Sequence, residues 1–271
     1  MRPLPELPGL LRLLSLSACM LLTGNIAVAN YQGIARAPDS GKILYREVHC
    51  TETPPHTAEN LPAETVFYLD ENNNRIATKR INGDFRFVPG RPVKPDTNSL
   101  PEGISPGWVP QYEFIHHTLG LAEGIAYQGD RILLKRREGK QVEPEVKQLS
   151  FASGDSPLIA DAGFDVFIRD NMSRLIGGES LKVTYLSAPR LSTLDFTLEP
   201  EKTGDDTLRI LMYPRNFVIR LLVDPITVVY DIPSGRLQSF QGLTNVPRNQ
   251  DDNFVAFIQY QYGEDLDAFC H

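Results

Sequence analysis

Histidine, cysteine and serine are the first residues to weigh, because they supply most metal ligands and nucleophiles in proteins. His116 and His117 are adjacent in a segment with strand character, so their side chains point to opposite faces and cannot bind one metal ion. No H-x-H, H-x₃-H or C-x₂-C spacing occurs in the chain, and no glycine pattern of the Rossmann or P-loop type is present. We therefore predict no metal site and no cofactor.

A serine nucleophile would need a general base and an oxyanion hole beside it. Residues 153–156 (SGDS) resemble an exposed turn before a helix. A hydrolase built on Ser156, with His116 or His117 as its base, is kept as an alternative. The leading interpretation is that the chain has no catalytic residues.

Aromatic side chains offer a different chemistry, which is the recognition of an apolar ligand. Phe164 and Phe167 fall on the apolar face of a predicted helix, and the sole tryptophan, Trp108, lies in a proline-rich segment. Asn171 projects from the middle of the same helix face, where a buried amide must be hydrogen-bonded. It either bonds to a strand backbone or anchors a ligand in a cavity. Trp108, Phe164, Phe167 and Asn171 are the candidate ligand-binding residues, and an ordinary filled core is the alternative.

These residues are positioned by one predicted helix over residues 161–178. Asp161 is its expected N-cap, and Gly177-Gly178 is its expected stop, since glycine adopts the left-handed conformation without a Cβ penalty. A short second helix is expected over residues 215–223, before Pro225.

The rest of the chain has the alternating pattern and turn residues of antiparallel strands. Residues 70–74 (DENNN), for example, predict a hairpin turn, because asparagine tolerates the left-handed region. A sheet of about a dozen strands must curl or split. We therefore predict an α+β fold, mostly β, in which a large curved antiparallel sheet, a half-open barrel, wraps around one central helix.

The first residues predict export. Arg2, Arg12, a short apolar run and the A-x-A sequence at 27–29 are typical of a signal peptide over residues 1–29. After it we expect a disordered lead-in at 30–40, a single β-rich domain at 41–262 and a C-terminal tail at 263–271. Six prolines between 86 and 110 indicate a flap within the domain, and a disordered connection is the alternative. The expected location is the periplasm, with no transmembrane segment after the signal is removed. Cys19 also fits a lipobox, so a lipid anchor at that residue is the alternative.

Cys50 and Cys270 remain after the leader, near the two ends of the mature chain. In an oxidising compartment such a pair predicts a disulfide, and the alternative is two free thiols. The formal net charge of −7, without a basic run, makes nucleic acid an unsuitable partner.

Three stretches are familiar: residues 163–169 (GFDVFIR), residues 188–191 (APRL), and a group formed by Tyr230-Asp231, Arg236-Leu237 and residues 242–245 (GLTN). Together they resemble a family of uncharacterised exported proteins of proteobacteria. The resemblance covers most of the mature chain, and it implies no activity and no functional residues. The expected helix within a curved sheet also resembles the layout of the Lol-type outer-membrane lipoprotein carriers, at the level of fold alone.

The leading hypothesis is a periplasmic, non-enzymatic protein that binds an apolar ligand or a lipidated partner, such as a lipid or a lipoprotein. A second hypothesis is an envelope assembly or scaffolding factor, which contacts an envelope protein through a sheet edge or the proline-rich flap. The serine hydrolase is the third.

Overall fold

The computed structural model describes residues 30–51, 64–81, 108–129, 131–149, 156–202, 204–263 and 266–270. The expected signal peptide, Cys19 and most of the proline-rich segment lie outside these ranges.

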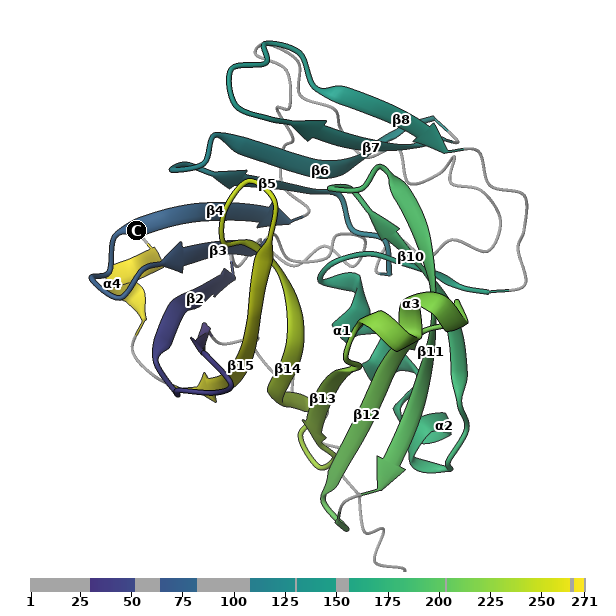
Figure 1. The fold of residues 1–271 in the computed structure, drawn as a ribbon. Helices are drawn as coiled ribbons and strands as arrows, with labels where there is room; N and C mark the ends of the chain where they lie inside the picture. The colour runs from purple at the N-terminus through teal and green to yellow at the C-terminus, as the bar shows by residue number, and fades with distance from the viewer. Residues whose placement is uncertain are drawn as a thin grey trace, which may run out of the picture.

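The described residues form one 15-stranded sheet that curves but does not close (Figure 1). At its centre β1 (Tyr31–Arg36) pairs with β15 (Asn253–Tyr262). Outward from β1 lie β2 (Ile43–Thr51), β3 (Glu64–Leu69), β4 (Arg75–Ile81), β5 (Tyr112–His116), β6 (Leu121–Gln128), β7 (Arg131–Arg137) and β8 (Glu145–Leu149). Outward from β15 lie β14 (Arg236–Pro247), β13 (Ile226–Asp231), β12 (Thr207–Pro214), β11 (Ser192–Lys202), β10 (Leu181–Ser187) and β9 (Leu158–Ile159). The mostly β, curved-sheet fold class is confirmed.

The expectation of a disordered lead-in over residues 30–40 was wrong, because β1 lies there as a central strand between β2 and β15. Its sequence, YQGIAR, is short and has little alternation, so it gives a weak strand signal. Glycine is needed at position 33, because a Cβ there would clash with its neighbours. It would lie 2.8 Å from Glu47 Cγ and 2.9 Å from Ile258 Cγ2. Close packing from both neighbouring strands therefore fixes this segment in the sheet.

The single helix expected over 161–178 is divided into α1 (Gly163–Asp170) and α2 (Met172–Ile176), which meet at Asn171. Asp161 does not cap it, since the N-cap position is Ala162, which makes no side-chain capping bond. Asp161 has φ 44°, in the left-handed region, and its carboxylate turns away to partners in the sheet. The expected second helix is present as α3 (Phe217–Leu222), where Asn216 Oδ1 accepts bonds from the Val218 and Ile219 N–H groups.

The helix pair covers only one half of the sheet. α1 and α2 pack mainly on β9 and β11, where Phe167, Ile168 and Leu175 are buried. The other half is filled mainly by the side chains of its own strands, together with residues that reach it from β9, β10 and the turn after β10, such as Leu158, Leu186 and Leu191. That core includes Tyr45, Tyr68, Tyr112, Phe114, Ile125, Ile132 and Leu134.

The start of α1 is fixed by the segment that enters β5. The Ala160 N–H donates to the Trp108 carbonyl oxygen at 2.8 Å. A Cβ at Gly163 would lie 2.0 Å from that same oxygen, so only glycine fits there. Among the described residues, no helix is long and apolar enough to cross a bilayer.

The expected disulfide joins Cys50 of β2 to Cys270 of α4 (Asp267–Cys270), with 5.5 Å between the two Cα atoms and a sequence separation of 220. Leu266, just before α4, is buried with Val48 and Leu69. The end of the chain is therefore docked against β2.

Loss of this bridge should lower stability. We expect Cys270→Ser to reduce the free energy of unfolding by about 2–5 kcal/mol, because the unfolded chain gains freedom when so long a loop opens. Urea denaturation of the protein without residues 1–29, oxidised and reduced, measures this. The reductant should have no effect on the variant, and equal midpoints for oxidised and reduced wild type would contradict the prediction.

Candidate functional site

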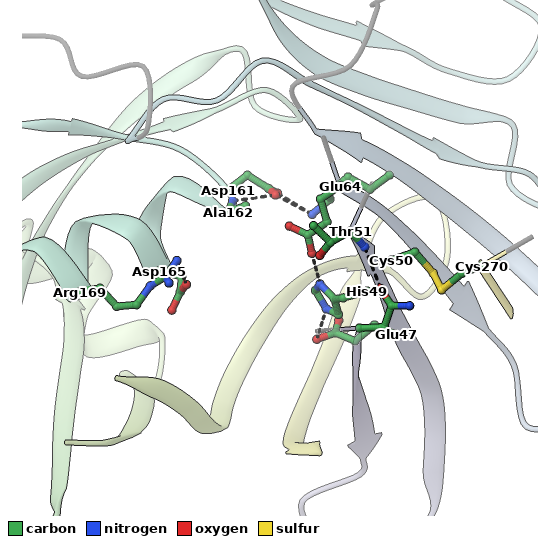
Figure 2. A network of polar contacts seen from close by, with 12 residues as sticks. Glu47, His49, Cys50, Thr51, Glu64, Asp161, Ala162, Asp165, Arg169 and Cys270 are labelled. Carbon is green, nitrogen blue, oxygen red and sulfur yellow. Dashed lines mark hydrogen bonds and ion pairs between the residues drawn. A yellow bond between two sulfur atoms is a disulfide. The ribbon is translucent and has the colours of Figure 1, made fainter. Parts of the chain in front are cut away.

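Charged side chains from distant parts of the chain meet inside the curve of the sheet (Figure 2). We call them the interior polar network; its members are Glu47, His49, Glu64, Lys79, Asp161, Asp165 and Asn245. They come from β2, β3, β4, β14, α1 and the turn that precedes α1. The network has three parts.

The first part is the Lys79–Asp161 ion pair. Lys79 Nζ donates to both carboxylate oxygens of Asp161, at 2.8 and 2.7 Å. Asp161 also accepts from Asn245 Nδ2 at 2.6 Å and from the Ala162 N–H at 2.9 Å. The two charged side chains are only 5% and 4% exposed. Each carboxylate oxygen thus has two donors, as a buried charge requires.

Aromatic rings surround the ammonium group of Lys79. The centroids of Tyr68, Tyr112 and Phe114 lie 5.7 to 5.9 Å from Nζ, within the range of a cation–π contact. Burial acts to lower the pKa of Lys79, but the charge and hydrogen bonds of Asp161 outweigh it and raise the pKa. Lys79 is therefore held as a cation.

Glu123 lies near this pair but, unlike Lys79 and Asp161, is uncharged. Burial raises its pKa to about 8, although the charge of Lys79 acts to lower it. Glu123 is thus protonated at neutral pH, and Asp161 is the charged partner of Lys79.

The second part is His49, held between two carboxylates. Its Nδ1 lies 2.5 Å from Glu64 Oε1, and its Nε2 lies 3.6 Å from Glu47 Oε1. The Tyr31 ring stacks on the imidazole with a centroid distance of 4.1 Å, and Tyr260 meets its edge. Burial acts to lower the pKa of His49, but the two glutamates raise it to about 9.

The third part lies on α1. Asp165 accepts from Tyr230 Oη at 2.9 Å and pairs with Arg169 at 2.8 Å. Burial raises the pKa of its carboxyl group. Figure 2 shows Asp165 on the side of α1 that faces Glu64 and His49.

The surroundings of His49 are arranged for charge compensation. An imidazole with a pKa of about 9 is protonated at neutral pH and has no lone pair with which to act as a base. Among the described residues, no three His, Cys, Asp or Glu side chains gather as a metal site would require. Sequence reasoning did not name this network; its one signal is that polar residues stand at inward positions of otherwise apolar strands.

The candidate ligand-binding residues have partners within the protein. Trp108 Nε1 donates to Asp170 Oδ2 at 2.7 Å, and its ring lies 5.0 Å from that of Phe167, edge on. Asn171 Nδ2 donates to the Phe167 carbonyl oxygen at 2.9 Å, within the helix pair and not to a strand, and Asn171 Oδ1 accepts from Arg174. Phe164 is half-buried beside them. The structure therefore brings Trp108, Phe167 and Asn171 together, and their role toward a ligand stays a prediction.

A groove lies elsewhere, at the β13–β14 turn and the end of β15. Its volume is about 340 Å³, and it is lined by Asp231, Ser234, Arg236, Gln238, Gln259, Tyr260 and Tyr262. The Tyr262 ring stacks on the Tyr31 ring, and the guanidinium of Arg236 lies 4.9 Å from the centroid of the Tyr262 ring. None of the four candidate ligand-binding residues lines it.

The two histidines of the hydrolase hypothesis form hydrogen bonds with residues other than Ser156. His116 Nδ1 accepts from the Leu119 N–H at 3.3 Å, and His117 Nε2 lies 2.9 Å from Thr78 Oγ1. No bond from Ser156 to either ring is found among the described residues. Residues 103–107 (GISPG) match the G-x-S-x-G pattern, which our sequence reasoning passed over, and they lie outside the described ranges.

Apolar side chains of α3 face solvent. Phe217, Val218 and Leu221 are 71%, 64% and 70% exposed, and Ile219 and Val223 are 38% and 40% exposed. None of these residues belongs to a core cluster of the described chain. We call them the α3 surface.

The Lys79–Asp161 pair should be a large contributor to stability. In Asp161→Asn the buried ammonium loses its counter-charge, so the free energy of unfolding should fall by about 3–5 kcal/mol. Urea denaturation at pH 7 measures the change. Glu179→Gln, which breaks the exposed Arg174–Glu179 pair, is the matched control and should change little. An Asp161→Asn protein as stable as wild type would contradict the role of this pair. Partial recovery of the free energy of unfolding in Lys79→Met/Asp161→Leu, which removes both charges, would support it.

His49 should make stability depend on pH. Its pKa is about 9 in the fold against 6.5 in the unfolded chain. Its contribution is therefore complete below pH 6.5 and is lost as the pH rises through 9. Glu123, with a folded pKa of about 8, also removes stability as the pH rises from 4.5 to 8.

The contribution of His49 can be separated with His49→Gln, which should flatten the fall in unfolding free energy between pH 6.5 and 9. His117→Gln is the control, because burial lowers the pKa of His117 and it stays neutral over that range. An NMR titration of the His49 ring with a midpoint near 6.5 would disprove the proposed charge state.

Comparison with known proteins assigns no family to this chain. No protein-family model matches the sequence, and no curated protein does. A similar solved structure is the "Crystal Structure of Beta-barrel-like Protein of Domain of Unknown Function DUF1849 from Brucella abortus". The alignment covers 86% of this chain and 93% of that chain, with 10% sequence identity and a TM-score of 0.45. A likeness of this degree carries no argument about function.

Proposed function

We propose that this chain is an exported, non-enzymatic binding protein that holds an apolar partner, such as the acyl chain of a lipidated molecule, on the α3 surface. The observation that carries the proposal is the exposure of Phe217, Val218 and Leu221 on one short helix. Burying one such side chain is worth about 1.5–3 kcal/mol. An apolar partner would supply that burial, since the fold itself does not.

The interior is a weaker candidate for the same role. Phe167 is fully buried against its neighbours, and the polar atoms of Trp108 and Asn171 already have partners. An acyl chain would have to displace these contacts, whereas α3 offers its apolar atoms without rearrangement.

Export is supported by two independent features. The sequence of residues 1–29 is typical of a signal peptide. The Cys50–Cys270 disulfide belongs to an oxidising compartment, because cytosolic thiols are kept reduced. The periplasm is the proposed location.

The scaffolding alternative has less support at the sheet edges. β8 presents Glu145, Val146, Lys147 and Gln148 to solvent, three of them polar or charged, and β9 has only two residues. Short or charged edges disfavour the addition of a partner strand. The α3 surface is therefore the better docking candidate.

The proposal is tested by an NMR titration of the mature protein with an N-octanoyl tetrapeptide, kept below its critical micelle concentration. Shifts should centre on α3, and Phe217→Ser/Leu221→Ser should weaken binding at least tenfold. Val142→Ser, at an 85% exposed valine between β7 and β8, is the matched control and should bind as wild type does.

The titration can also fail in two informative ways. Shifts centred on Phe164, Phe167 and Asn171 would move the site to the interior and overturn the α3 assignment. The absence of shifts at all concentrations would reject an acyl-binding function.

A further inference from the structure

We propose that α3 inserts into the interface of a phospholipid bilayer, and this inference rests on the proposed function of the α3 surface. Phe217, Val218 and Leu221 would enter the acyl boundary, while Arg215 and Arg220 would stay at the level of the lipid phosphates. The partner is thus a membrane surface rather than a protein.

The geometry of α3 fits such insertion. At about 100° per residue, Phe217, Leu221 and Val218 fall within one arc of about 100°, and Arg220 lies to one side of it. An interfacial helix lies in the membrane plane and buries its apolar face about 5–10 Å, and α3 presents its apolar arc over a length of about 9 Å. The arc therefore forms a small apolar wedge.

The wedge contacts the sheet on one side. Its main neighbour is β12, and the guanidinium of Arg220 lies 3.8 Å from the centroid of the Tyr213 ring in that strand. The Asn216 side chain fixes the first turn through the Val218 and Ile219 N–H groups. The helix is therefore preformed, and insertion does not have to supply the free energy of folding it.

The size of the surface argues against a stable protein interface. Even when Ile219 and Val223, which lie outside the apolar arc of α3, are included, the exposed apolar area is on the order of 500 Å², whereas a standard interface buries about 800 Å² on each partner. A bilayer needs no such minimum, because it closes around any apolar shape that enters it.

The charges around α3 predict how the binding depends on salt. Arg215 and Arg220 are exposed and can reach phosphate oxygens, as long cationic side chains do at interfaces. Asp224 follows Val223 and is exposed as well, and the whole chain carries −7. Long-range attraction to an anionic surface is therefore absent, and apolar burial must supply the binding.

We test this with flotation of the mature, disulfide-bonded protein on large unilamellar vesicles. One set is made of phosphatidylcholine, and the other of phosphatidylethanolamine and phosphatidylglycerol at a ratio of about 4:1. The protein should float with both sets, with a partition constant on the order of 10⁴ M⁻¹, comparable with one myristoyl chain. Raising the salt from 0.1 to 0.5 M should change it less than threefold.

Phe217→Ser/Leu221→Ser should lower the partition constant at least tenfold, and Val142→Ser should leave it unchanged. Equal flotation of all three proteins would overturn the assignment to α3. A loss of flotation in 0.5 M salt would overturn insertion in favour of electrostatic adsorption.

Two further outcomes separate this inference from the proposed function. Binding of the octanoyl peptide at α3 without flotation would overturn the bilayer and leave the proposed function intact. Concentration-dependent dimerisation in analytical ultracentrifugation, lost in Phe217→Ser/Leu221→Ser, would make α3 an interface between copies of the chain and overturn the inference. Failure of both the peptide and the vesicles would reject both proposals.

Discussion

The buried ion pair between Lys79 and Asp161 is the interaction on which the shape of the sheet depends. Lys79 stands on β4, and Asn245, the second partner of Asp161, stands on β14, five strand steps away in the sheet. Five steps in a flat sheet would separate these residues by about 24 Å. Both side chains nevertheless reach one carboxylate, so the sheet must curl until its two halves face each other.

The same pair explains an unfavourable backbone conformation. Asp161 has φ 44°, which costs free energy for a residue other than glycine, although aspartate tolerates it better than most. The turn presents the carboxylate to Lys79 and, with Gly163 under the Trp108 carbonyl, sets where α1 begins. Removing the negative charge would leave the ammonium buried among aromatic rings, which is why one substitution there should affect the whole fold.

The interior and the exterior have different tasks in this arrangement. Inside the curve, charged side chains are placed near opposite charges or hydrogen-bond donors: His49 lies between Glu47 and Glu64, and Asp165 bonds to Tyr230. On the outside, α3 has apolar side chains that the core does not use. The proposed binding therefore takes place on a preformed external helix, and the rigid sheet only holds that helix in position.

Local chemistry in the sequence determined much of this structure. The hairpin at 70–74 forms as expected, because Asp70 Oδ1 accepts from the Asn72 and Asn74 N–H groups and Asn73 adopts φ 66°. The strict alternation of β12 and the short helix before Pro225 were also readable, since both depend on neighbouring residues alone. The pairing of Cys50 with Cys270 followed from their number and the expected compartment.

Tertiary structure alone decided the features that join distant residues. The short segment of β1 became a strand because β2 and β15 pack on both of its sides, and the helix was interrupted where Asn171 bonds back to Phe167. Asp161 has the pattern of an N-cap but serves as a counter-ion for Lys79. The two residues lie 82 positions apart in sequence, so no local pattern could indicate their contact. A local pattern reports the preferences of neighbours, whereas a buried charge takes whichever partner the fold brings within reach.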